Sequence, residues 1–179
     1  MIQVKVDLTG ALQFLKIHLP RAIDAATVRG LDRTAVSARK SAMKEIREKT
    51  GLPPKFLRER LTIRRASLNN LTAEIRAAKG APNLARFNAR QVKSGVSANA
   101  WNVRKVYKGA FIANGGRTAF ARTSKARLPL KPLRGPSVPK AFLQAAAQRA
   151  IAEAVAAQFP KHFASALQGQ LARYRARGS

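Results

Sequence analysis

The chain has 179 residues, long enough for one domain with a substantial core and too short for two comfortable ones. Its 35 Lys and Arg against 8 Asp and Glu give a net charge of +27, while 46% hydrophobic residues argue against wholesale disorder. The absence of cysteine excludes disulfides and thiolate chemistry, and the charge predicts an anionic partner, whether nucleic acid, an acidic protein surface or a membrane face.

The first predicted elements are a short strand over residues 2–6, where apolar and polar residues alternate, and a short helix capped by Thr9. A long helix then runs from about Pro20 to Lys49 and ends at Gly51. Its apolar face is rich in small residues, which predicts close packing on a sheet, and a basic ridge lies opposite. The basic ridge consists of Arg29, Arg33, Lys40, Lys44 and Arg47. A solvated helix face explains this ridge more simply than an anion-binding surface does.

Shorter elements follow as far as residue 78. Residues 56–60 are expected to form one helical turn and residues 61–64 a strand. A turn at 67–70 and a second alternating run at 71–78 complete the pattern of two antiparallel strands.

Residues 80–108 form the least periodic part of the sequence. We expect a long loop or an extended hairpin that projects from the domain. Trp101 and Tyr107 lie among its cations as possible stacking groups.

The next elements are predicted from turn residues and prolines. A buried strand at 110–113 is joined through a turn at 114–116 to a strand at 118–122. A second basic loop then leads to a strand at 128–133, whose prolines favour the edge of a sheet.

The C-terminal helix begins near Pro139. Its apolar residues recur every four positions from Ile151 to Leu171, so their stripe would drift around one straight helix. We therefore expect Pro160 to break the helix in two. The fold class that follows is α+β: a small antiparallel sheet packed by a long N-terminal helix and a C-terminal helix, with projecting basic loops.

Several short segments, taken together in their order and spacing, carry a resemblance to a known family. They are Thr50-Gly51-Leu52-Pro53, the strand from Arg60 to Arg65, Ala89 to Val96, Gly109-Ala110-Phe111-Ile112-Ala113, Arg127-Leu128-Pro129-Leu130 and Gly135-Pro136-Ser137-Val138-Pro139. From about Ala35 to about Phe142 the chain resembles the minor tail protein Z family, the tail-completion proteins of lambda-like long-tailed phages. The resemblance makes residues 1–179 a single tail-completion domain, with a core over about 1–160, a basic loop at 80–108 and a C-terminal helical arm over about 139–177.

The resemblance implies a structural virion protein at the head-proximal, neck end of the tail, which completes the tail and supports head–tail joining. It would be assembled in the host cytoplasm beside tail tube or tail terminator proteins and head–tail connector proteins. We expect a homo-oligomeric ring, because closed cyclic symmetry lets one surface patch serve repeatedly. A hexameric ring would match the tail symmetry that the resemblance implies.

Genome passing through such a ring would meet cations that bind phosphate without selecting bases. The residues expected to face DNA or an acidic partner are Arg86, Arg90, Lys93, Arg104, Lys105, Arg122, Lys125 and Arg127. The basic ridge is the second choice. For any one of these cations, simple exposure to solvent or contact with an acidic neck protein is the simpler explanation.

A free, sequence-independent nucleic-acid-binding basic protein is the alternative function, supported by the charge and the two aromatic residues. No catalytic, cofactor or metal site is expected, since no phosphate loop or hydrolase motif occurs and His18 and His162 lack partners at ligand spacing.

No secretory signal is visible, so a soluble protein made in a reducing compartment is expected. No uncharged run reaches the roughly 20 residues that span a bilayer, and the C-terminal helix has few cations beside its apolar stripe. A membrane partner is therefore not expected.

Overall fold

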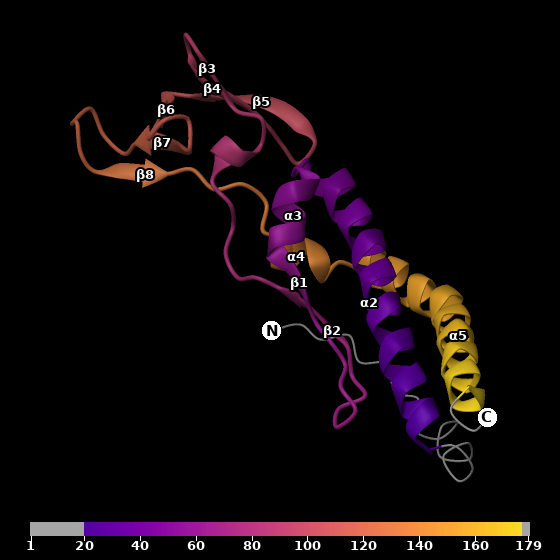
Figure 1. Ribbon diagram of the computed structural model, residues 1–179. Coiled ribbons are helices and arrows are strands. Elements are labelled where there is room, and N and C mark those ends of the chain that lie inside the picture. The colour runs from indigo at the N-terminus through magenta and orange to yellow at the C-terminus, as the bar shows by residue number, and fades with distance from the viewer. Residues whose placement is uncertain (1–19, 177–179) are drawn as a thin grey trace. The chain divides into compact units, whose positions relative to one another are not determined.

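The structure is a computed structural model that describes residues 20–176. The strand predicted at 2–6 and the helix capped by Thr9 lie outside the described residues. Contacts gather the chain into two compact units. Figure 1 labels their helices and strands. The described part of unit 1 comprises residues 20–42, 61–76 and 148–176, and unit 2 comprises residues 43–60 and 77–147.

Helix α2 spans Pro20–Thr50, which confirms the long N-terminal helix. Gly51 ends it with a φ of +72°, and its N–H donates to the carbonyl oxygen of Arg47 over 2.8 Å. The buried apolar residues of α2 recur with helical spacing and are Ile23, Ala26, Leu31, Ala35, Ala38, Ala42 and Ile46.

In unit 1, strands β1 (Leu61–Arg64) and β2 (Glu74–Ala77) form a two-stranded sheet. Ser67 and Asn70 exchange backbone hydrogen bonds of 2.9 and 3.0 Å, which confirms the turn between the strands. β2 is shorter than the predicted strand at 71–78, and it begins at Glu74, the first buried residue of that segment.

Helix α5 (Ala145–Arg175) packs against α2 within unit 1. A Cβ at Gly30 would lie 3.2 Å from the Cα of Phe163, so the two helices approach closely there. Thr34 Oγ1 lies 3.2 Å from Nδ1 of His162. The small residues of α2 therefore serve helix packing as well as the predicted packing on a sheet.

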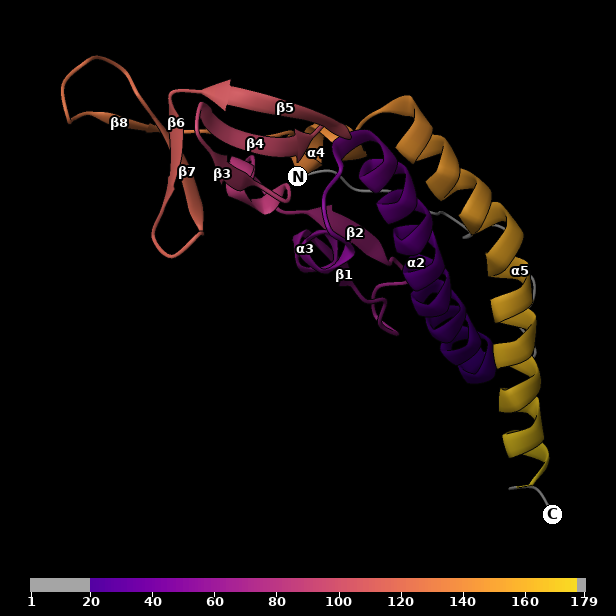
Figure 2. The ribbon, with the colours of Figure 1, turned by 90° about the horizontal axis from the view of Figure 1, so that it is seen from above.

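The predicted break at Pro160 is wrong, because α5 runs through this residue as one curved helix (Figure 2). The interruption lies earlier, between α4 (Val138–Phe142) and the start of α5. Proline has no N–H, so Pro160 leaves the carbonyl of Ala156 without its usual helical hydrogen bond. Both residues are exposed, so water can solvate that carbonyl. The apolar stripe of α5 advances by four residues at a time as far as Phe163 and then by three to the buried Ala166. The shorter step turns the stripe back and so corrects its drift around the helix.

Unit 2 contains two three-stranded antiparallel sheets. In sheet order, these are β3 (Arg90–Val92), β4 (Gly95–Ala100) and β5 (Val103–Lys108), and then β6 (Ala110–Ala113), β7 (Thr118–Arg122) and β8 (Leu130–Pro132). Helix α3 (Pro54–Arg60) and the short helix η1 (Leu84–Arg86) complete the unit, together with α4 and the last turns of α2.

The long-loop alternative for residues 80–108 is wrong, and the hairpin alternative is confirmed for β4 and β5. Trp101 and Asn102 form the two-residue turn, with φ values of +57° and +56°, the arrangement of a type I′ turn. The central strand β4 is buried mainly through Val96, Ala98 and Ala100. These side chains are too small to give the sequence a clear apolar alternation.

The predicted hairpin of β6 and β7 is confirmed, and residues 114–116 of its turn all have positive φ. β8 is shorter than the strand predicted at 128–133, and it lies at the edge of its sheet, as the prolines of that prediction indicated. The fold class is α+β, as expected, with small antiparallel sheets and long helices near both ends of the described chain.

Candidate functional site

The most unusual feature of unit 2 is a segment without negative charge. Residues 77–147 contain no Asp or Glu, so all 8 acidic residues of the chain lie elsewhere. Every Lys and Arg in this segment is exposed. These fourteen cations are Lys79, Arg86, Arg90, Lys93, Arg104, Lys105, Lys108, Arg117, Arg122, Lys125, Arg127, Lys131, Arg134 and Lys140. This acid-free segment was not predicted, although the positions of the acidic residues in the sequence reveal it.

The carboxylates of unit 2 do not neutralise these cations. Its acidic residues are Glu45, Glu48 and Glu59, and within this unit none of the fourteen cations lies within ion-pair distance of them. In unit 1, by contrast, Glu74 accepts two hydrogen bonds from Arg76, at 2.7 and 2.9 Å. Unit 2 therefore presents uncompensated positive charge to its surroundings.

Three cations share one face of the β3–β4–β5 sheet, and we call them the cationic sheet face: Arg90, Arg104 and Lys108. Their partners across the ladder are Ser97, Asn99 and Gly95, alternate residues of β4, so their side chains lie on one side. The Arg104 Nη1 donates to Ser97 Oγ over 3.1 Å. The structure thus groups two predicted residues with Lys108, which the sequence analysis did not select.

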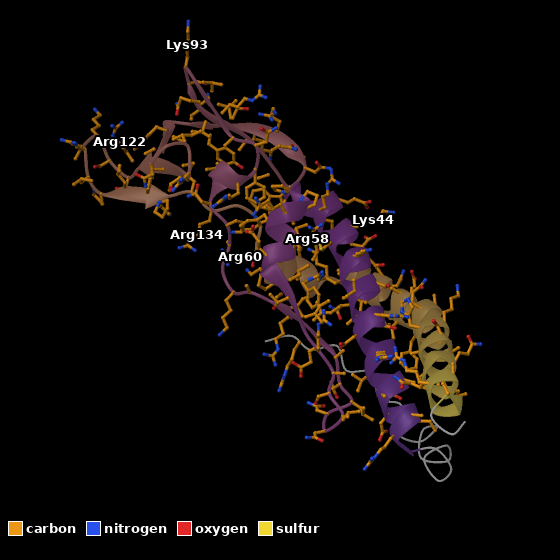
Figure 3. All side chains as sticks on the ribbon, in the orientation of Figure 1. Lys44, Arg58, Arg60, Lys93, Arg122 and Arg134 are labelled. Atoms are coloured by element: carbon orange, nitrogen blue, oxygen red, sulfur yellow. The ribbon has the colours of Figure 1, made fainter. Side chains whose placement is uncertain are left out.

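Other predicted residues lie apart from this face. Lys105 pairs with Ala98, so its side chain lies on the opposite side of the sheet. Lys93 projects from the turn between β3 and β4 (Figure 3). Lys125 and Arg127 are exposed in the segment between β7 and β8.

Aromatic rings support two further groups of cations. Arg60 and Arg86 both lie over the Phe56 ring, with guanidinium carbons 5.2 and 5.9 Å from its centroid. Arg122 lies over Phe111 at 5.1 Å. Cation–π contacts of this kind hold a guanidinium in place while leaving N–H donors free for an anion. Arg60, labelled in Figure 3, was not among the predicted residues.

The basic ridge remains a separate candidate. Arg29, Arg33, Lys40, Lys44 and Arg47 are all exposed along α2. Exposure alone fits both a solvated helix face and an anion-binding surface.

Among residues 20–176, no group of three or more His, Cys, Asp or Glu side chains is arranged to hold a metal ion. His162 is half-buried against α2 rather than on the open surface. In the same part of the chain no helix combines the length and apolarity needed to cross a bilayer.

Comparison with protein families gives a match over most of the chain. The family model described as "Prophage minor tail protein Z (GPZ)" matches residues 8–177. No curated protein and no solved structure matches the chain. The family match extends on both sides of residues 35–142, where the sequence resemblance was found, and includes all of α5.

Proposed function

The chain belongs to the prophage minor tail protein Z family, a family of structural phage tail proteins, and from this premise we propose that it completes the head-proximal end of the tail and supports head–tail joining. Both units would act as one tail-completion domain in the virion neck, after assembly in the host cytoplasm. Its neighbours would be the tail tube or tail terminator and the head–tail connector. The proposal assigns no catalysis.

A ring of identical subunits around the DNA channel is the assembly that best uses the charge. Closed cyclic symmetry repeats one basic surface around an axis, and six subunits would match the tail symmetry that the family implies. The observation that carries the proposal is the acid-free segment of unit 2, with its fourteen exposed cations. Repeated around a ring, so much uncompensated charge requires a polyanion or acidic neighbours.

The cationic sheet face is the part that we assign to DNA. Extended strands hold Arg90, Arg104 and Lys108 on one side of a sheet, where each can meet a phosphate. Phosphate contacts carry no sequence information, as passage of a whole genome requires. Arg122 and the exposed cations after it provide further contacts.

The test replaces all three residues of the cationic sheet face by glutamine. The matched control removes the same charge from α5 through Arg149→Gln, Lys161→Gln and Arg173→Gln, which are exposed cations of unit 1. Phage lacking the native gene would be complemented with either variant. We expect normal numbers of tails with both, and loss of DNA-end retention and infectivity only with the sheet variant. Equal infectivity of the two variants would refute a DNA-contacting role for this face.

The alternative is a free, sequence-independent nucleic-acid-binding protein. The observation that favours it is Trp101, which is 54% exposed within the acid-free segment and offers an aromatic surface for stacking. Gel shifts with the purified, unassembled protein at physiological salt distinguish the two functions. Tight, salt-sensitive binding by the monomer, together with its absence from purified virions, would replace the tail function by this one.

A further inference from the structure

Unit 2 contains an open pocket of about 500 Å³, and none of the three residues of the cationic sheet face lines it. The end of α2 provides Lys49 and Thr50, the β4–β5 turn provides Trp101, and the start of α4 provides Lys140. The segment Gly135-Pro136-Ser137 forms another wall. No carboxylate lines the pocket, and its volume is in the range of ordinary ligand sites.

Backbone contacts hold Trp101 in place in the wall of the pocket. The Trp101 N–H donates to the carbonyl oxygen of Thr50 over 3.1 Å. A Cβ at Gly51 would lie 2.6 Å from the carbonyl oxygen of Asn99, so the hairpin can approach the helix end only because this residue is glycine. Trp101 itself has a φ of +57°, which bulky residues rarely adopt and which is concentrated at functional positions.

The opposite wall is fixed by a second glycine. Gly135 donates its N–H to the carbonyl oxygen of Pro82 over 2.9 Å. A Cβ at Gly135 would overlap the ring of Phe87, which is fully buried. Thr50 and the segment Gly135-Pro136-Ser137 lie far apart in the sequence, and both line this pocket.

We propose that the pocket binds a short acidic peptide segment of a neighbouring protein in the assembled tail. Carboxylates would pair with the ammonium groups of Lys49 and Lys140, and an apolar side chain would lie against Trp101 and Pro136. The proposal relies on the proposed function only for placing that partner in the tail.

Other occupants fit the pocket less well. A second copy of the chain brings 35 Lys and Arg but only 8 acidic residues, and two of those, Asp32 and Glu74, already pair with arginines of unit 1. Double-stranded DNA keeps its bases stacked inside the duplex, so it presents no base that can enter a pocket beside an indole. An acidic peptide supplies both the charge and the apolar group that these walls accept.

The experiment uses the full chain and its single tryptophan, which is Trp101. The probes are acetylated hexapeptides with two glutamates around one leucine, phenylalanine or proline, and the controls carry glutamine in place of glutamate. Tryptophan emission is titrated with each peptide. We expect a saturable change with glutamate peptides and none with glutamine peptides. Lys49→Ala and Lys140→Ala should each weaken binding by about tenfold, the effect of losing one charge-assisted hydrogen bond.

The matched controls are Lys93→Ala and Lys125→Ala, exposed lysines of unit 2 outside the pocket, which should leave peptide affinity unchanged. Thermal unfolding confirms that all four variants are folded. The proposal is overturned if no glutamate peptide gives a saturable signal, or if the controls lose as much affinity as the pocket variants. Tighter binding of a six-nucleotide oligothymidylate probe, with the same dependence on Lys49 and Lys140, would assign the pocket to nucleic acid instead. Each of these failures leaves the infectivity test of the cationic sheet face intact.

Discussion

Gly30 of α2 lies directly against the backbone of Phe163 in α5, so no side chain separates the two helices at this point. A Cβ on residue 30 would be 3.2 Å from the Phe163 Cα and 3.3 Å from its backbone nitrogen. Gly30→Leu adds a branched side chain that the buried site cannot hold without moving α5. We expect the free energy of unfolding to fall by about 1–3 kcal/mol, measured by chemical denaturation.

Gly169 is the matched control for this substitution. It lies in α5, the helix that Gly30 contacts, is exposed, and has open space where a Cβ would stand. Gly169→Leu should raise the free energy of unfolding by several tenths of a kcal/mol, because leucine favours a helix over glycine by roughly that amount. Similar stabilisation by both substitutions would show that α2 and α5 do not approach closely at Gly30.

The β4–β5 turn predicts opposite effects for two substitutions of Asn102. This residue is exposed and has a φ of +56°. Asn102→Gly should raise the free energy of unfolding by about 0.5 kcal/mol, because glycine is preferred at the second central position of a type I′ turn. Asn102→Val should lower it by about 1–2 kcal/mol, because a β-branched residue is strained at positive φ. Thermal unfolding of the two variants measures both, and equal melting temperatures would contradict the turn assignment.

The contact between Gly135 and Phe87 predicts a coupled pair of substitutions. Gly135→Ala places a Cβ against the buried ring and should lower the free energy of unfolding by about 1–3 kcal/mol. In a Phe87→Leu background the same change should cost less, because leucine lacks the ring atoms that the new Cβ meets. A double-mutant cycle from denaturation curves measures this coupling. Strict additivity of the two changes would place residue 135 away from the ring.

The pair of Glu74 and Arg76 predicts that substitution of the glutamate rescues a variant that lacks the arginine. Glu74 is 7% exposed and accepts hydrogen bonds from Arg76 Nε and Nη2. Arg76→Met alone leaves a carboxylate with little access to water, at a cost of about 2 kcal/mol once partial exposure of the arginine is allowed for. Adding Glu74→Leu to that variant should recover much of the loss, since it removes a buried carboxylate whose remaining ion pair, to Arg64 at 3.8 Å, is long. Further loss in the double variant would mean that the pair itself is strongly stabilising.

The sequence predicted the elements with strong local signals. Helix α2 follows from its period and from Gly51, and the β6–β7 hairpin follows from its Asn-Gly-Gly turn. The prediction at Pro160 was wrong because a proline breaks a helix only where the freed carbonyl lacks another partner, and that depends on which side of α5 faces solvent. Burial of this kind is decided by tertiary packing, which local sequence does not encode.

The candidate site was predictable in composition but not in arrangement. The positive charge of residues 80–127 was evident, whereas the grouping of Arg90 and Arg104 with Lys108 depends on the register of three strands. The turn at Trp101 and Asn102 sets the register of β4 with β5, and neither residue is a glycine that would signal a type I′ turn. The place of Arg86 over Phe56 likewise depends on a contact between distant segments.

The register of β4 and β5 leads to the last prediction, which concerns two adjacent cations. Arg104 belongs to the cationic sheet face, whereas Lys105 lies on the side where Val96, Ala98 and Ala100 are buried. If the sheet meets DNA through that face, Arg104→Gln should reduce the slope of log K against log salt by about 0.9 for random duplex DNA. Lys105→Gln removes the same charge from the next residue and should change the slope much less. Assembled protein in filter-binding titrations between low and physiological salt gives both slopes. Equal reductions would mean that net charge, rather than one face of the sheet, governs the contact with DNA.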